Sequence, residues 1–170
     1  MPYQAEISRT NPSCFLFLVD QSSSMKDLFA GGASGGTKAQ GVADAVNNLL
    51  QNLVSKCTKS DGIRDYYNVG VIGYGGGGVA PAFGGALARK ELVPISMVGN
   101  NPIRVEQRIK QVADGRGGFA DRKVNSPIWF EPTCGGGTPM WCCAYKSFSG
   151  FETVHGPKPV LFPTNCHQHL

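Results

Sequence analysis

The stretch Cys-Phe-Leu-Phe-Leu-Val-Asp, residues Cys14 to Asp20, decides the fold that we predict for this chain. Its first six residues form an unbroken apolar run, whereas a strand with one solvated face alternates apolar and polar residues. We therefore expect a central β-strand covered on both faces. Asp20 should lie at its carboxyl end, the edge at which open α/β sheets bind ligands.

The order strand, helix, strand follows from the next sixty residues. After a loop rich in Gly and Ser, apolar residues recur at the spacing of one helical face: Val42, Val46, Leu49, Leu50, Leu53 and Cys57. Residues Tyr67 to Tyr74 then predict a second buried strand. This order implies parallel strands joined by a right-handed crossover, and therefore an α/β layered domain.

The following part of the chain predicts shorter elements. Residues 91–96 should form a short edge strand. Pro102 should open a helix whose face holds Val105, Ile109 and Val112, because proline suits the first turn of a helix. Residues 115–137 predict a long polar loop of the kind that is often functional.

The last part of the chain predicts one more helix and one more strand. The helix should begin at Thr138-Pro139, and Pro159 to Phe162 could form the strand. A chain of 170 residues suits one domain. We expect residues 1–12 to be an N-terminal extension and residues 13–170 a single domain, divergent over 141–170.

Charge and hydrophobicity argue against two classes of partner, nucleic acids and membranes. The formal net charge is +4, and the basic residues are scattered without aromatic partners, which predicts a solvated surface and no nucleic-acid partner. No stretch is long enough for a membrane span, and the N-terminus lacks the features of a secretory signal, so we expect no membrane partner and a cytoplasmic location by default.

The six cysteines are expected to be reduced. Cys14 lies in an apolar run and Cys57 ends a helical pattern, so both predict buried small hydrophobes. The remaining Cys and His residues near the C-terminus match no standard zinc spacing. The glycine clusters 75–78 and 135–137 lack the Lys-Ser/Thr ending of a phosphate-binding loop.

The pentapeptide Asp20-Gln21-Ser22-Ser23-Ser24 has the pattern Asp-x-Ser-x-Ser. Alternate side chains leaving a tight loop can converge, which would bring the Asp20 carboxylate and the Ser22 and Ser24 hydroxyls to one point. A cluster of oxygens suits a hard cation such as Mg²⁺. The same residues could instead make turns or cap a helix. A second loop, Gly135 to Met140, offers the Thr138 hydroxyl at a predicted helix start.

Residues Leu18 to Met25 and Gly136 to Met140 together resemble the von Willebrand factor type A (VWA) domain family, most closely its stand-alone bacterial members. The resemblance implies a Rossmann-like, three-layer sandwich with a mostly parallel central sheet, an antiparallel edge strand and helices on both faces. It implies a metal-ion-dependent adhesion site in which Ser22, Ser24 and Thr138 bind Mg²⁺, or Mn²⁺ or Ca²⁺ in its place, while Asp20 acts largely through bound water.

The same resemblance implies binding rather than catalysis. Neutral hydroxyls leave the cation under-neutralised, so a carboxylate from a partner protein can complete its coordination. The family has a further metal-site aspartate, and here only Asn165 stands near the corresponding position. The last strands and helices of the family fold are missing from the sequence pattern, so a truncated fragment with a defective metal site is one alternative. A serine hydrolase is another, although neither Ser22 nor Ser24 lies in a Gly-x-Ser-x-Gly motif.

Overall fold

The computed structural model describes residues 6–29, 36–75, 77–113 and 119–137, with only the backbone for 110–113 and 119–120. Within them, four strands form one mixed sheet. Their bounds are β1 Ser13–Asp20, β4 Tyr67–Gly75, β5 Gly78–Pro81 and β6 Val93–Pro94. β1 runs parallel to β4, and the short β5 and β6 pair with β4 in the antiparallel sense. The predicted parallel pair is confirmed.

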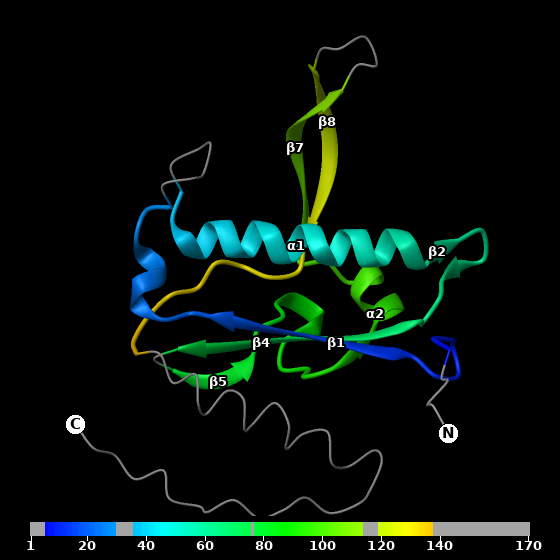
Figure 1. Cartoon of the computed structure of the whole chain (residues 1–170), viewed down its shortest axis with the longest axis horizontal. Helices are drawn as coiled ribbons and strands as arrows, with labels where there is room; N and C mark the ends of the chain where they lie inside the picture. The colour runs from blue at the N-terminus through cyan, green and yellow to red at the C-terminus, as the bar shows by residue number, and fades with distance from the viewer. Residues whose placement is uncertain (1–5, 30–35, 76, 114–118, 138–170) are drawn as a thin grey trace, which may run out of the picture.

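The helix α1, Lys38–Cys57, joins the two parallel strands and lies over one face of the sheet (Figure 1). It begins where the Thr37 side chain caps the backbone N–H of Gln40, an ordinary N-cap contact. A small hairpin follows, formed by β2 Thr58–Lys59 and β3 Gly62–Ile63. The shorter helix α2, Ile95–Asn100, packs against α1. The chain is therefore a mixed α/β protein.

The core lies between α1 and the sheet. Leu50 of α1 and Val69 and Val71 of β4 are completely buried, and Trp129 packs in the same cluster. The predicted helical face is confirmed at Val46, Leu50 and Cys57. It is wrong at Leu49, whose side chain is 49% exposed, because residue 49 lies on the side of α1 that faces away from the sheet.

β1 is less covered than its apolar run predicts. It stands at the end of the strand order β1-β4-β5, so within the described residues only β4 pairs with it. Cys14 is exposed, and Phe15 and Leu18 are 39% and 46% exposed. The predictions of a strand covered on both faces and of a buried Cys14 are therefore wrong for the described part of the chain.

The helix predicted from Pro102 is wrong, because this segment is the first strand of a hairpin. β7, Arg104–Ala113, pairs antiparallel with β8, Phe119–Ile128, and the two project beyond α1 (Figure 1). Val105 and Ile109 are four residues apart, an even spacing that also places them on one face of a strand. That face meets solvent, with Val105 55% and Ile109 66% exposed.

Two neighbouring predictions change for related reasons. Pro102 follows α2, whose C-cap is Asn101, and proline is common just after a helix as well as in its first turn. β8 replaces much of the predicted loop 115–137, leaving residues 129–137 without regular structure. The predicted edge strand 91–96 is confirmed only at Val93 and Pro94. The helix predicted at Thr138, the strand 159–162 and the divergent part 141–170 lie outside the described residues.

None of the helices in the described ranges is long and apolar enough to cross a membrane.

Two adjacent leucines of α1 test this core. Replacing Leu50 by alanine should lower the free energy of unfolding by about 2–5 kcal/mol, because its fully buried side chain would leave a cavity. The control Leu49→Ala should change it by less than about 0.5 kcal/mol, because that side chain is half exposed. Urea denaturation measures both, and equal losses would contradict the orientation of α1.

Candidate functional site

The candidate site begins where β1 ends. Asp20 is the last residue of β1 and lies opposite Tyr74 of β4. The next residue, Gln21, donates its backbone N–H to the Tyr74 carbonyl at 2.7 Å, so the ladder fixes the chain one residue beyond the strand. The 3₁₀ helix η1, Ser23–Lys26, then turns the chain back, and its Met25 is buried. Ser22 to Ser24 therefore follow directly after a chain segment that is hydrogen-bonded to β4.

The structure brings the Ser22 and Ser24 hydroxyls together and places the Asp20 carboxylate against the Ser22 backbone. The Ser22 backbone N–H donates to Oδ1 of Asp20 at 2.8 Å, and the Ser22 and Ser24 hydroxyl oxygens lie 3.1 Å apart. Ser22 is 2% exposed although it is polar, whereas Ser24 is exposed. The three residues thus present two hydroxyls and one carboxylate at the end of β1.

The spacing of the two hydroxyls suits an octahedral cation. At a metal–oxygen distance of about 2.1 Å, two adjacent octahedral ligands are separated by the diagonal of a right angle, about 3.0 Å. The Ser22 and Ser24 oxygens are already at 3.1 Å. The oxygen positions therefore suit a small hard cation, which would replace the hydrogen bond that now joins the two hydroxyls.

The glycine loop, which we define as residues 135–137, is hydrogen-bonded to the serine loop, which we define as residues 21–24. The Gly135 N–H donates to the Gln21 carbonyl at 2.7 Å, and the Ser23 N–H donates to the Gly136 carbonyl at 2.8 Å. Segments more than 110 residues apart in sequence thus meet at this edge. Thr138 follows directly, but Thr138 and Asn165 both lie outside the described residues.

A hollow of about 390 Å³ lies beside the serine loop. Apart from Gln21 and Ala80, its walls are glycines of β4, β5 and the connection between them, and of the glycine loop. Two of these glycines leave room for Gln21. A Cβ at Gly73 would stand 2.1 Å from Oε1 of Gln21, and one at Gly75 would stand 2.7 Å from the Gln21 carbonyl oxygen.

Negative charge near the serine loop is limited. In the described part of the chain, no three His, Cys, Asp or Glu residues gather as a metal-binding group, so Asp20 is the acidic member of the candidate site. Asp27, three residues after Ser24, pairs with Lys38 at 3.0 Å on the surface. A cation held here would therefore be bound mainly by neutral oxygens.

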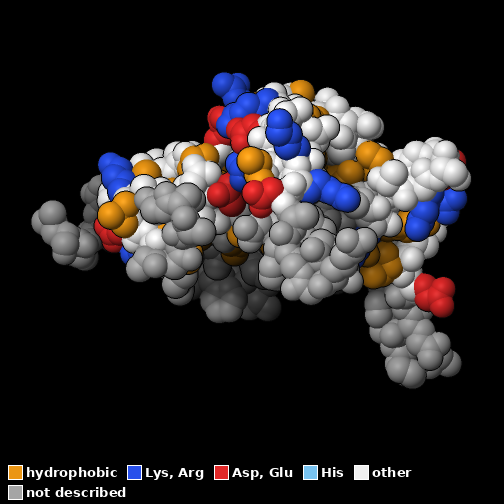
Figure 2. All heavy atoms as spheres, turned by 90° about the horizontal axis from the view of Figure 1, so that it is seen from above, with side chains coloured by type: hydrophobic (Ala, Val, Ile, Leu, Met, Phe, Trp, Pro, Cys, Tyr) orange, Lys and Arg blue, Asp and Glu red, His pale blue; other side chains and the backbone are white. Residues whose placement is uncertain are grey.

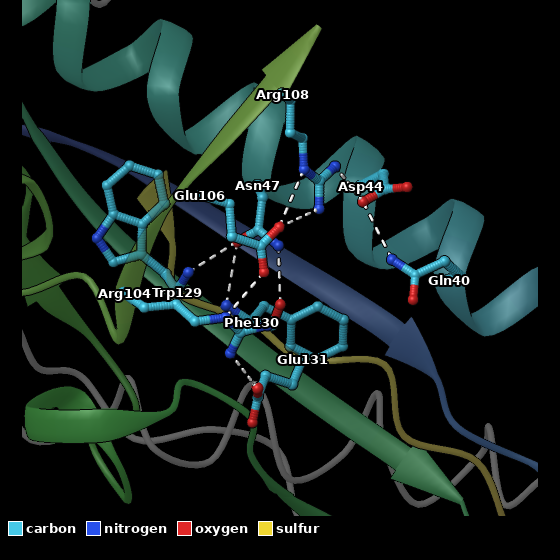
Figure 3. A network of polar contacts seen from close by, with 9 residues as sticks. All are labelled: Gln40, Asp44, Asn47, Arg104, Glu106, Arg108, Trp129, Phe130 and Glu131. Atoms are coloured by element: carbon cyan, nitrogen blue, oxygen red, sulfur yellow. Dashed lines mark hydrogen bonds and ion pairs between the residues drawn. The ribbon is translucent and has the colours of Figure 1, made fainter. Parts of the chain in front are cut away.

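Sequence reasoning missed a buried polar contact behind the site. Asn47 of α1 is 5% exposed and hydrogen-bonds the backbone of Trp129 and Phe130, at the entry to the segment that leads to the glycine loop (Figure 3). The available signal was an asparagine between Val46 and Leu50, on an otherwise apolar helical face.

Comparisons with known proteins identify no relative. No protein-family model matches the chain, and neither a curated protein nor a solved structure matches it.

Glycine substitutions test how tightly β4 packs on the serine loop. Gly75→Ala should lower the free energy of unfolding by about 1–3 kcal/mol, because its Cβ would collide with backbone atoms of Gln21. Gly77→Ala is the matched control, since nothing lies within 4 Å of its added Cβ. Chemical denaturation compares the two variants. A Gly75→Ala protein as stable as Gly77→Ala would show that the loop does not approach β4 this closely.

Proposed function

We propose that this chain is a VWA-type domain that binds a partner protein through a divalent cation held by Asp20, Ser22, Ser24 and Thr138. The observation that carries the proposal is the 3.1 Å separation of the Ser22 and Ser24 hydroxyl oxygens, next to a backbone N–H that donates to the Asp20 carboxylate. Backbone hydrogen bonds join the same loop to the glycine loop. The parallel pair β1–β4 with α1 between them supports it, because a Rossmann-like sheet would contain this unit.

Each residue has a distinct part in the proposal. Ser22 and Ser24 bind the cation directly through their hydroxyls, and Thr138 adds a third hydroxyl from the residue after the glycine loop. The Asp20 carboxylate accepts a hydrogen bond from the Ser22 backbone N–H, which orients the carboxylate beside the serine loop. When bound, Mg²⁺ or a similar cation supplies an electrophilic position that a carboxylate can occupy.

The charge of the site favours an acidic partner. One carboxylate does not neutralise a divalent cation, and the nearby Asp27 is already paired with Lys38. A partner aspartate or glutamate would therefore gain a charge-assisted bond on binding. We propose binding without catalysis, with the two serines acting as ligands and not as nucleophiles.

Metal-dependent stability tests this function. Mg²⁺ or Mn²⁺ should raise the melting temperature of the wild-type chain, because binding to the folded state alone stabilises it by about 2.7 kcal/mol at one hundred times the dissociation constant. Ser22→Ala should abolish the shift. Ser23→Ala should retain it, since Ser23 contacts Gly136 through its backbone N–H, which alanine keeps.

Thermal denaturation with and without each metal gives the comparison, with EDTA as the baseline. If all three proteins melt at the same temperature with and without metal, the proposed site does not bind. If Ser23→Ala loses the shift together with Ser22→Ala, the shift does not come from the two converging hydroxyls. A genuine partner should dissociate on addition of EDTA and should bind Ser23→Ala but not Ser22→Ala.

A further inference from the structure

The segment that leads to the glycine loop starts deep in the core. Trp129 and Phe130 follow β8 and are 1% and 2% exposed. The Trp129 carbonyl accepts the N–H of Gly84 at 2.9 Å, and the Trp129 indole donates to the Val98 carbonyl at 2.6 Å. Three buried backbone groups remain, the N–H groups of both residues and the Phe130 carbonyl. Each needs a partner, because an unpaired buried group costs free energy.

Asn47 supplies all three partners with one side chain (Figure 3). Its Oδ1 accepts the N–H of Trp129 at 2.8 Å and that of Phe130 at 3.1 Å, and its Nδ2 donates to the Phe130 carbonyl at 2.8 Å. Asparagine is a poor residue for a helix interior, and burying its amide is costly without hydrogen bonds. Its presence here is explained by the backbone that it holds.

An ion pair between Asp44 of α1 and Arg108 of β7 joins the helix to the base of the hairpin. Arg108 of β7 pairs with Asp44 at 2.7 Å and with Glu106 at 3.0 Å, and together with Arg104 it keeps the pKa of the Glu106 carboxyl below its ordinary value. Figure 2 shows acidic and basic side chains close together near the middle of this surface. These pairs are about a third exposed and contribute little each. Asn47 is the buried contact in the network.

Hydrogen bonds therefore hold both ends of the segment from Phe130 to the glycine loop. Asn47 holds Phe130, and five residues later Gly135 donates to the Gln21 carbonyl. Few residues separate the two ends, so a shift at Phe130 should reach the hydrogen bonds between the two loops.

We propose that Asn47 is a positioning residue for the candidate metal site. It fixes where the glycine loop meets the serine loop. The inference rests on the proposed function for its link to metal, whereas the link to the loop can be measured separately.

Three variants of the full chain test this proposal. Asn47→Ala removes all three hydrogen bonds. Asn47→Asp keeps an acceptor for the two N–H groups but faces the Phe130 carbonyl with an oxygen, and it serves if the alanine variant does not fold. Leu50→Ala is the control, because it destabilises the same helix without touching Trp129 or Phe130 through a hydrogen bond. Circular dichroism establishes that each variant is folded.

Two measurements are made on each variant and on the wild type. The first is the affinity for Mn²⁺ by calorimetry. The second is hydrogen exchange at the backbone N–H groups of Ser23 and Gly135, compared with exchange at Val71 of the core, which is fully buried and reports changes in global stability.

We expect Asn47→Ala to weaken Mn²⁺ binding roughly 10- to 100-fold, as changes behind metal ligands commonly do. Exchange at Ser23 and Gly135 should accelerate relative to Val71. Leu50→Ala should change the Mn²⁺ affinity by no more than about twofold and should not accelerate exchange at Ser23 and Gly135 by a larger factor than at Val71, since it leaves the hydrogen bonds to Phe130 intact. A Mn²⁺ affinity of Asn47→Asp between those of the wild type and Asn47→Ala would show that the hydrogen bond from Asn47 to the Phe130 carbonyl accounts for part of the effect.

An unchanged Mn²⁺ affinity in a folded Asn47 variant overturns the proposal while leaving the proposed function in place. If the wild type itself does not bind Mn²⁺, the proposed function fails, and hydrogen exchange alone decides about Asn47. Accelerated exchange at Ser23 and Gly135 would then support its role in positioning the loop, and unchanged exchange would overturn it.

Discussion

Two backbone hydrogen bonds join the serine loop to the glycine loop, and the candidate site depends on them. The Gly135 N–H reaches the Gln21 carbonyl, and the Ser23 N–H reaches the Gly136 carbonyl. The serine loop follows β1, which is paired with β4 along its length, and the glycine loop follows the buried Trp129–Phe130 pair. Oxygens from distant parts of the chain can therefore be presented at one sheet edge without a long-range side-chain contact between the loops themselves.

Close packing behind the loops explains the unusual composition of this edge. Gly73 and Gly75 leave room for Gln21, whose side-chain and backbone atoms occupy the space that Cβ atoms would need. Nearer to β8, the Asn47 side chain hydrogen-bonds the backbone of Trp129 and Phe130, which belong to no strand and so have no strand partner there. A region with so little secondary structure is thus held by specific contacts, which is the arrangement that preorganised ligands require.

The sequence allowed correct prediction of the order and direction of the central elements, although not of the burial of β1. The parallel pair β1–β4 and the helix between them follow from apolar runs, and the closeness of the Ser22 and Ser24 hydroxyls follows from the alternation of a short polar motif. The hairpin β7–β8 could not be predicted from the spacing of Val105 and Ile109, because four residues suit both a helix and a strand and these side chains face solvent. Asn47 was hidden for a different reason, since its partners are backbone groups about eighty residues away.

The central claim is that the Ser22 and Ser24 hydroxyls bind one cation directly. Crystals of the full chain grown with Mn²⁺ would test it through the anomalous signal of the metal. The account predicts one peak within bonding distance of both hydroxyl oxygens, with the Thr138 hydroxyl in the same coordination shell. A peak elsewhere on the surface would contradict the claim. So would a serine loop in which the Ser22 and Ser24 hydroxyls remain hydrogen-bonded to each other with no metal beside them.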